Sequence, residues 1–194
     1  MTASRPVLLT VGHSNIELQD FVDLLNSAGV QAIVDVRSDP DRVYRKHFAS
    51  QPLQAALGRA GIGYVFLGEG LGGRPRLHEH HDADGHARYD LMAEQPAFLA
   101  ALDRVIVGAR TRKLALMCSE ENPAECHRRL LVGRALMDRG VDLQHLRGDG
   151  SVVSESELAV IDGQDGLFDD LEVRPWRSAR SVPRSGAPSP SSEH

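Results

Sequence analysis

Short continuous apolar runs alternate with amphipathic stretches along most of this chain. Apolar runs of four to eight residues without polar interruption are typical of strands that are buried on both faces of a sheet. Residues 7–11 form such a run, and further β-rich runs predict four more strands, at residues 31–36, 62–67, 113–118 and 141–146.

Helical patterns fill the gaps between these runs. Residues 17–29 repeat apolar side chains at helical spacing and end at Gly29, and Pro96 opens a second amphipathic stretch to about Ala109. Ser50 as N-cap with Pro52 in the first turn predicts a helix over 51–60. A further helix is predicted from the N-cap Asn122 to Arg139, where Gly140 stops it. Ser154-x-x-Glu157 indicates the start of one more short helix.

Strict alternation of strands and helices favours an α/β fold. We predict a three-layer Rossmann-like architecture, with a mostly parallel sheet of about five strands and helices on both faces. Residues 1–171 are expected to form this single domain, with a long glycine-rich stretch at 68–93 that is functional or hides a short helix. Residues 172–194, rich in Ser, Pro and Arg, are expected to be a disordered basic tail.

Composition narrows the classes of protein that remain. Of 194 residues, 41% are hydrophobic and 25% are charged, which suits a folded domain with a core. The net charge of −5 argues against general electrostatic attraction to nucleic acid, although a local basic groove stays open. We expect neither a signal peptide nor a membrane span, and two cysteines cannot make a disulfide framework. A cytoplasmic protein with reduced thiols is therefore predicted.

Polar and titratable residues follow the predicted strands. In open parallel sheets, ligands gather at the carboxyl ends of the strands. This rule brings together His13 after the first strand, Arg37 and Ser38 after the second, and Cys118 and Glu120 after the fourth. The glycine-rich stretch after the third strand lies at the same edge.

The stretch "MCSEENPAECHRRLL" holds both cysteines of the chain. Its Cys118-x7-Cys126-His127 spacing matches no common zinc pattern, but a metal site stays open, with His13 or His47 as the further ligand in three dimensions. Six residues beyond Cys118 stands Ala124, so the Cys-x5-Arg loop of thiol phosphatases is absent. A strand end that faces a helix start and Arg residues favours a thiolate at Cys118, whereas burial as a small core residue is the alternative.

Several neighbouring residues are candidates for chemistry. Glu120 is a candidate base, nucleophile or hydroxyl acceptor, and His13 a candidate proton-transfer partner. Arg37 and Arg128 are candidate anion ligands, and a buried pair with Glu120 or its acidic neighbours is the alternative for Arg128. We also assign substrate-binding roles to Ser38, Gly72, Gly73, Tyr89 and His127.

Four of the nine histidines lie in "LHEHHDADGHARYD". This composition is similar to metal-binding tracts, but the histidines have no regular spacing, which favours a solvated loop. No residue is assigned as a metal ligand, and no cofactor is expected.

Five motifs together resemble the family called domain of unknown function 488. They are "TVGHSN", "IVDVRSDP", "GIGYVFLGEGLGG", the later Tyr89, and "LMCSEENPAECHR", and they cover about residues 7–147. The resemblance implies a compact α/β domain but no settled reaction. The positions that it singles out are Gly12, His13, Ser14, Asp35, Arg37, Ser38, Pro40, Leu67, Gly68, Gly72, Gly73, Tyr89, Cys118, Glu120, Cys126, His127 and Arg128.

Three functional hypotheses follow. The first is an enzyme, a hydrolase or group transferase, that acts on a small anionic substrate such as a nucleotide or sugar-phosphate derivative. Its catalytic residues would be Glu120, Cys118 and His13. The second is a non-catalytic module that binds a nucleotide or a nucleic-acid end, and the third is a Cys/His metal-binding protein.

Overall fold

The computed structural model describes residues 5–42, 44–163 and 176–182, and it contains a six-stranded sheet of the predicted kind. The strands lie in the order β3-β2-β5-β1-β6-β7, and only the β6–β7 pair is antiparallel. Their bounds are β1 Val7–Gly12, β2 Ala32–Asp35, β3 Gly63–Phe66, β5 Leu114–Cys118, β6 Asp142–Leu146 and β7 Val152–Ser154. The α/β prediction is thus confirmed, with one strand more than expected.

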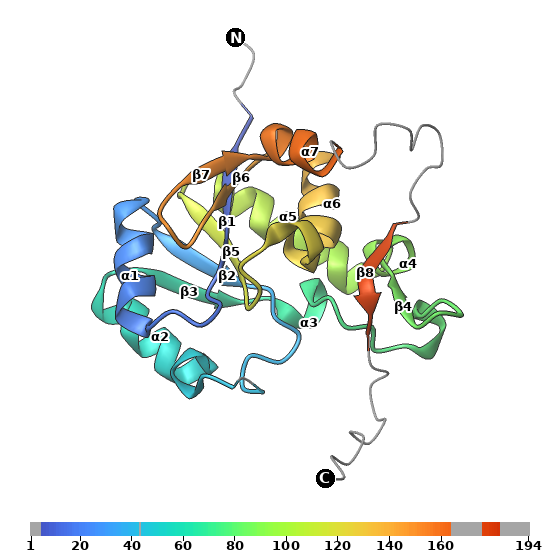
Figure 1. The fold of residues 1–194 in the computed structure, drawn as a ribbon, viewed down its shortest axis with the longest axis horizontal. Coiled ribbons are helices and arrows are strands. Elements are labelled where there is room, and N and C mark those ends of the chain that lie inside the picture. The colour runs from blue at the N-terminus through green and yellow to red at the C-terminus, as the bar shows by residue number, and fades with distance from the viewer. Residues whose placement is uncertain (1–4, 43, 164–175, 183–194) are drawn as a thin grey trace.

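Helices cover both faces of this sheet (Figure 1). The helix α1 (Leu18–Ser27) and the helix α2 (Ser50–Arg59) pack on one face through Phe21, Leu25 and Leu53. On the other face lie α5 (Pro96–Ala109) and α6 (Arg134–Met137), which bury Phe98 and Leu136. Strands β1, β2 and β5 sit between these two apolar layers, so they bury almost every side chain.

The stretch at 68–93 contains several short elements. They are α3 (Gly68–Leu71), a 3₁₀ turn η2 (His78–His80), β4 (His86–Arg88) and α4 (Tyr89–Ala93). A second 3₁₀ turn, η1 (Lys46–Phe48), precedes α2. The helix α2 begins at Ser50 rather than after it, because Asp41 accepts hydrogen bonds from both the Ser50 N–H and its hydroxyl, at 2.9 and 2.7 Å.

Strand β8 (Arg177–Ser181) corrects the prediction of a disordered tail. It pairs antiparallel with β4 to form a second, two-stranded sheet. The Trp176 indole N–H donates to the Leu130 carbonyl at 2.6 Å, and the Arg134 guanidinium stacks on its ring at 4.7 Å. A single large apolar residue in a polar segment gives no repeating apolar pattern, so the sequence did not predict this strand. The rest of the predicted tail, residues 172–175 and 183–194, lies outside the described residues.

The predicted helix from Asn122 to Arg139 is divided in the structure. Asn122 caps only one 3₁₀ turn, η3 (Pro123–Glu125), because Cys126 is extended at φ −96° and ψ 137°. The chain then coils again as a π-helical segment, η4 (Arg128–Gly133), which continues into α6. This break buries Cys126 completely while the next residue, His127, faces a pocket. The final helix α7 (Glu155–Gly163) follows β7, as the Ser154-x-x-Glu157 pattern predicts.

Candidate functional site

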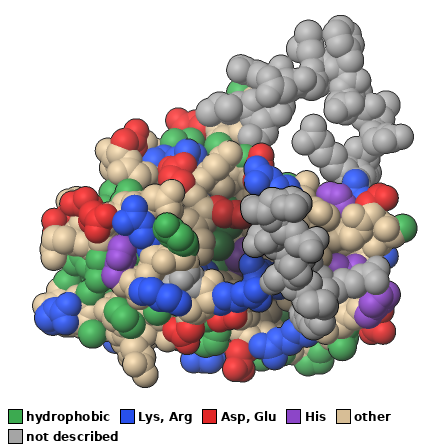
Figure 2. Space-filling view, turned by 60° about the horizontal axis from the view of Figure 1, so that its bottom comes forward, with side chains coloured by type: hydrophobic (Ala, Val, Ile, Leu, Met, Phe, Trp, Pro, Cys, Tyr) green, Lys and Arg blue, Asp and Glu red, His purple; other side chains and the backbone are tan. Residues whose placement is uncertain are grey.

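A pocket of about 300 Å³ opens where the parallel strands end, at the edge that faces downward in Figure 1. Figure 2 turns this edge toward the reader, and Lys and Arg side chains gather across the middle of that face. Its walls include the segments that follow β2 and β5, the turn after α3, and β8. Arg180 of β8 closes one side through an ion pair with Glu125.

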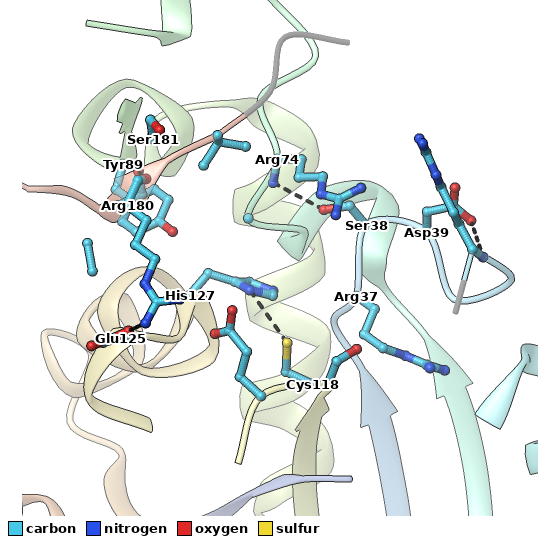
Figure 3. A pocket seen from close by; sticks show the side chains of 17 residues that line it. Arg37, Ser38, Asp39, Arg74, Tyr89, Cys118, Glu125, His127, Arg180 and Ser181 are labelled. Carbon is cyan, nitrogen blue, oxygen red and sulfur yellow. Dashed lines mark hydrogen bonds and ion pairs between the residues drawn. The ribbon is translucent and has the colours of Figure 1, made fainter. Parts of the chain in front are cut away.

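Cys118 lies at the floor of this pocket, at the end of β5, with its side chain facing His127 (Figure 3). The Cys118 Sγ is 3.7 Å from the His127 Nδ1. The other ring nitrogen, Nε2, donates to the Val36 carbonyl at 2.8 Å. That bond leaves Nδ1 facing the sulfur. The backbone just after β2 thus fixes the orientation of the His127 ring toward Cys118 at the end of β5.

The neighbours of Cys118 favour its thiolate form. A hydrogen bond from the Cys126 thiol, which outweighs the effect of burial, lowers the pKa of the Cys118 thiol, and His127 and Arg128 lower it further. Burial opposes a charge on His127, but the adjacent Cys118 sulfur prevails and raises the pKa of His127. Burial and the Cys118 sulfur raise the pKa of Cys126, which therefore keeps its proton. A thiolate beside an imidazolium follows from these opposite shifts.

Two arginines on the pocket wall have no ion pair among the described residues. Arg42 comes from the loop after β2, and Arg74 from the turn after α3. The Arg74 backbone N–H donates to the Ser38 hydroxyl at 3.1 Å, which holds the two sides of the pocket together. Arg42 was not predicted from the sequence, since a charged loop residue carries no signal of where it points.

The acids of the pocket are exposed. Glu120 and Glu125 lie on the segment that follows β5, and Asp39 lies opposite them. Tyr89, at the start of α4, is buried beside this group. Burial, and then the nearby Cys126 and Glu120, raise the pKa of Tyr89, so its hydroxyl stays protonated.

Arg37 borders the pocket, but its guanidinium points away from Cys118 (Figure 3). It pairs with the buried Asp35 carboxylate at 2.6 Å and donates to the Phe48 carbonyl at 2.8 Å. Tyr64 also donates to Asp35, at 2.8 Å. The Asp35 carboxylate therefore balances the Arg37 charge inside the protein. The Arg37 guanidinium, through its bond to the Phe48 carbonyl, orders the loop that carries Arg42.

His13 lies behind the pocket wall. Its ring stacks on Phe48 at 4.1 Å, its Nδ1 donates to the Ser14 carbonyl at 3.0 Å, and its Nε2 faces the Arg37 Nη1 at 3.4 Å. Burial, and then the Arg37 charge, lower the pKa of His13 to about 4. The structure thus places His127, rather than His13, beside the sulfur of Cys118.

Arg128 is also directed inward. It is 1% exposed, and it donates to the carbonyls of Glu120 and Glu121 and to the Thr10 hydroxyl. Its side chain holds the segment after β5 in place rather than lining the pocket. Gly12 makes the same segment possible, since a Cβ there would lie 1.8 Å from the Glu120 carbonyl oxygen.

The glycine pair after α3 has two different surroundings. Gly72 packs against Ser38 and lies outside the pocket lining. Gly73 borders the pocket and lies against the His127 ring, where an added Cβ would be 2.4 Å from the ring Cγ. The absence of a side chain at Gly73 therefore allows the imidazole to occupy its position.

Cys118, Cys126 and His127 are also the one group of potential metal ligands within the part of the chain that the structure describes. Their ligand atoms lie within 4.8 Å of one another. Two thiolates and an imidazole are a donor set that suits zinc. The histidines of the predicted loop form no such group there, and His86 instead donates to the Ser178 carbonyl at 2.7 Å.

Comparison with known proteins gives one match. A family model described as "Domain of unknown function DUF488" matches residues 17–135, in agreement with the resemblance seen in the motifs. Neither the curated proteins nor the solved structures contain a match. No described helix has both the length and the apolar character that crossing a membrane requires.

Proposed function

Since this chain belongs to the DUF488 family, whose description names no reaction, we propose its function from its own pocket: it is a hydrolase or group transferase that uses Cys118 as nucleophile on a small anionic substrate. The observation that carries this proposal is the Cys118–His127 pair at the floor of a pocket that is also bordered by Arg42 and Arg74, which form no ion pair with the residues that the structure describes.

The contacts of the Cys118 sulfur support its assignment as the nucleophile. A thiolate attacks electrophiles far faster than a thiol does, and it needs both a lowered pKa and access to substrate. Cys118 has both, because Cys126 and His127 lower its pKa and its side chain borders the pocket. Cys126 has neither, since it is fully buried with a raised pKa.

The anionic character of the substrate is supported by Arg42 and Arg74. A guanidinium binds carboxylate or phosphate oxygens with paired hydrogen bonds, and neither of these two is committed to an acid of the described chain. A volume of about 300 Å³ suits a small metabolite, such as a nucleotide or sugar-phosphate derivative.

The reaction we propose has two steps. The Cys118 thiolate attacks an electrophilic carbon or phosphorus, and the bond to the leaving group breaks as the His127 imidazolium gives that group its proton. Water or an acceptor molecule then attacks the thio-linked intermediate and loses its proton to His127 or to Glu120. The bond to the sulfur breaks, which returns the thiolate.

A pair of alkylating probes tests the site without a known substrate. Iodoacetate is anionic and iodoacetamide is neutral, so the ratio of their rates at Cys118 reports on nearby positive charge. We expect a higher ratio than for a free thiol in water, and a loss of that preference in Arg42→Gln and Arg74→Gln. Arg59→Gln, an exposed residue at the end of α2, is the matched control and should change nothing.

Turnover is tested with a panel of nucleotides and sugar phosphates, by intact-mass detection of a Cys118 adduct and by product analysis. Cys118→Ser should abolish the adduct, and Glu120→Gln should slow turnover. Full activity of both variants on an identified substrate would disprove the assignment. Protection of Cys118 from alkylation without any turnover would favour a binding module instead.

A further inference from the structure

Cys126 provides a second sulfur directly behind the nucleophile. Cys126 is 0% exposed and does not border the pocket, whereas Cys118 is 6% exposed and does. The Cys126 sulfur nevertheless lies within 4.8 Å of the Cys118 sulfur. The proposed reaction needs only one of these sulfurs, so the pairing calls for another role.

The separation of the two sulfurs is short. Their Sγ atoms belong to a group that lies within 4.8 Å, whereas a disulfide bond is about 2.05 Å long. Rotation of both side chains, with a small shift of the backbone at Cys126, would close this gap. Cys126 is the extended residue between the η3 turn and η4 rather than a residue inside a helix.

We propose that Cys118 and Cys126 form a reversible intramolecular disulfide when a hydroperoxide enters the pocket. This inference rests on the same accessible Cys118 sulfur as the proposed function, but not on the identity of the substrate. It makes Cys126 the resolving thiol of a peroxide-sensitive pair.

The chemistry balances with the hydroperoxide as the oxidant. The Cys118 thiolate attacks one peroxide oxygen, the O–O bond breaks, and His127 protonates the departing oxygen, which leaves a sulfenic acid on Cys118. The Cys126 sulfur, which gives its proton to His127, then attacks the Cys118 sulfur and releases water. The two thiols have lost two electrons and the peroxide has gained them.

The order of oxidation follows from accessibility. Only Cys118 borders the pocket, so it meets the peroxide first, and Cys126 reaches the sulfenic acid from behind without passing through solvent. While the disulfide persists, the nucleophile is blocked and protected from further oxidation. A dithiol reductant restores it, because exchange needs only access to one sulfur of the bond.

The test treats the full chain with hydrogen peroxide, quenches it with iodoacetamide under denaturing conditions and counts the alkylated cysteines by intact mass. We expect the wild type to lose both alkylatable thiols as a monomer and to regain both after dithiothreitol. Digestion after Glu121 places the two cysteines on separate peptides, which only the disulfide would join.

Two variants separate the roles of the sulfurs. Cys126→Ser should accumulate a sulfenic acid on Cys118 that dimedone traps, and then over-oxidised forms that dithiothreitol does not reduce. Cys118→Ser should leave Cys126 unoxidised at the same peroxide dose. If Cys126→Ser does not fold, the peptide map of the wild type decides alone.

Three results would overturn the proposal. The first is over-oxidation of Cys118 in the wild type at the same rate as in Cys126→Ser, and the second is a disulfide between two chains. The third is a stoichiometric metal ion in the purified protein that holds both thiols and prevents their oxidation. If the iodoacetate preference of Cys118 persists while no disulfide forms, the redox inference fails and the proposed function stands.

Discussion

His13 should make this protein sensitive to mild acid. Its imidazole is 4% exposed, stacks on Phe48 and faces the Arg37 guanidinium, so a proton on the ring would place two buried cations side by side. The folded state therefore resists protonation, and the pKa of His13 falls from 6.5 to about 4. The unfolded chain has no such restriction and takes up the proton near the ordinary value.

The magnitude follows from this difference. A folded-state pKa below the unfolded one means that the unfolded chain binds the proton first as the pH falls, so stability is lost between about 6.5 and about 4. At roughly 1.4 kcal/mol for each pKa unit, the full loss is about 3 kcal/mol. Most of it, about 2.5 kcal/mol, is expected by about pH 4.5.

The assay compares two variants at two pH values. We would measure the free energy of unfolding by urea titration near pH 7.5 and near pH 4.5. Wild type should lose about 2.5 kcal/mol more than His13→Gln over this range, because the amide does not titrate. His78→Gln, which removes an exposed imidazole, is the matched control and should behave as wild type.

A second measurement addresses the cause directly. The NMR titration of the His13 ring should give a midpoint near 4, in the range where few histidines titrate. Equal acid sensitivity of wild type and His13→Gln, or an NMR midpoint near 6.5, would refute the reasoning.

Two further predictions concern the residues that position the pocket. Gly73→Ala should sharply slow alkylation of Cys118, since the new Cβ would lie 2.4 Å from the His127 ring. Gly58→Ala on α2 is the control, because its Cβ meets no atom within 4 Å. This control should stabilise the protein by roughly 0.5–1 kcal/mol. Equal alkylation rates in the two variants would contradict the role given to Gly73. Arg128→Met should lower the free energy of unfolding by about 3 kcal/mol, because two carbonyls after β5 lose the buried guanidinium that donates to them. Urea titration against Arg59→Met, an exposed change expected to cost less than about 0.5 kcal/mol, checks this, and equal stabilities would disprove it.

Much of the fold follows from local patterns in the sequence. The five predicted strands correspond to β1, β2, β3, β5 and β6. The signal is strongest for β1, β2 and β5, because strands buried on both faces need apolar residues at nearly every position. The helix α5 begins at Pro96, as its sequence predicts, since proline suits a first helical turn. Local rules failed at Cys126, where an extended residue divides a segment with every helical signal, and at β8, whose anchors lie far away in the chain.

The edge of the sheet that carries the pocket was also predictable from sequence. Parallel strands place their carboxyl ends together, so Cys118, Ser38 and Glu120 were expected at one edge, and all three border the pocket. Side-chain directions were not predictable in the same way. Arg37, Arg128 and His13 were candidates for direct roles, yet the structure turns their polar groups inward to Asp35, to backbone carbonyls and to each other.

The sequence by itself thus determined the five parallel strands, most of the helices between them and the edge where chemistry can occur, because these depend on periodicity and on the connectivity of the chain. Only the tertiary structure decided which histidine contacts the sulfur, that Cys126 lies behind it, and which arginines border the pocket without an acidic partner among the described residues. Those outcomes depend on rotamers and on close approaches, such as that of Gly73 to the His127 ring, between segments distant in sequence. No local pattern encodes such contacts, since each is a property of two segments and not of either one alone.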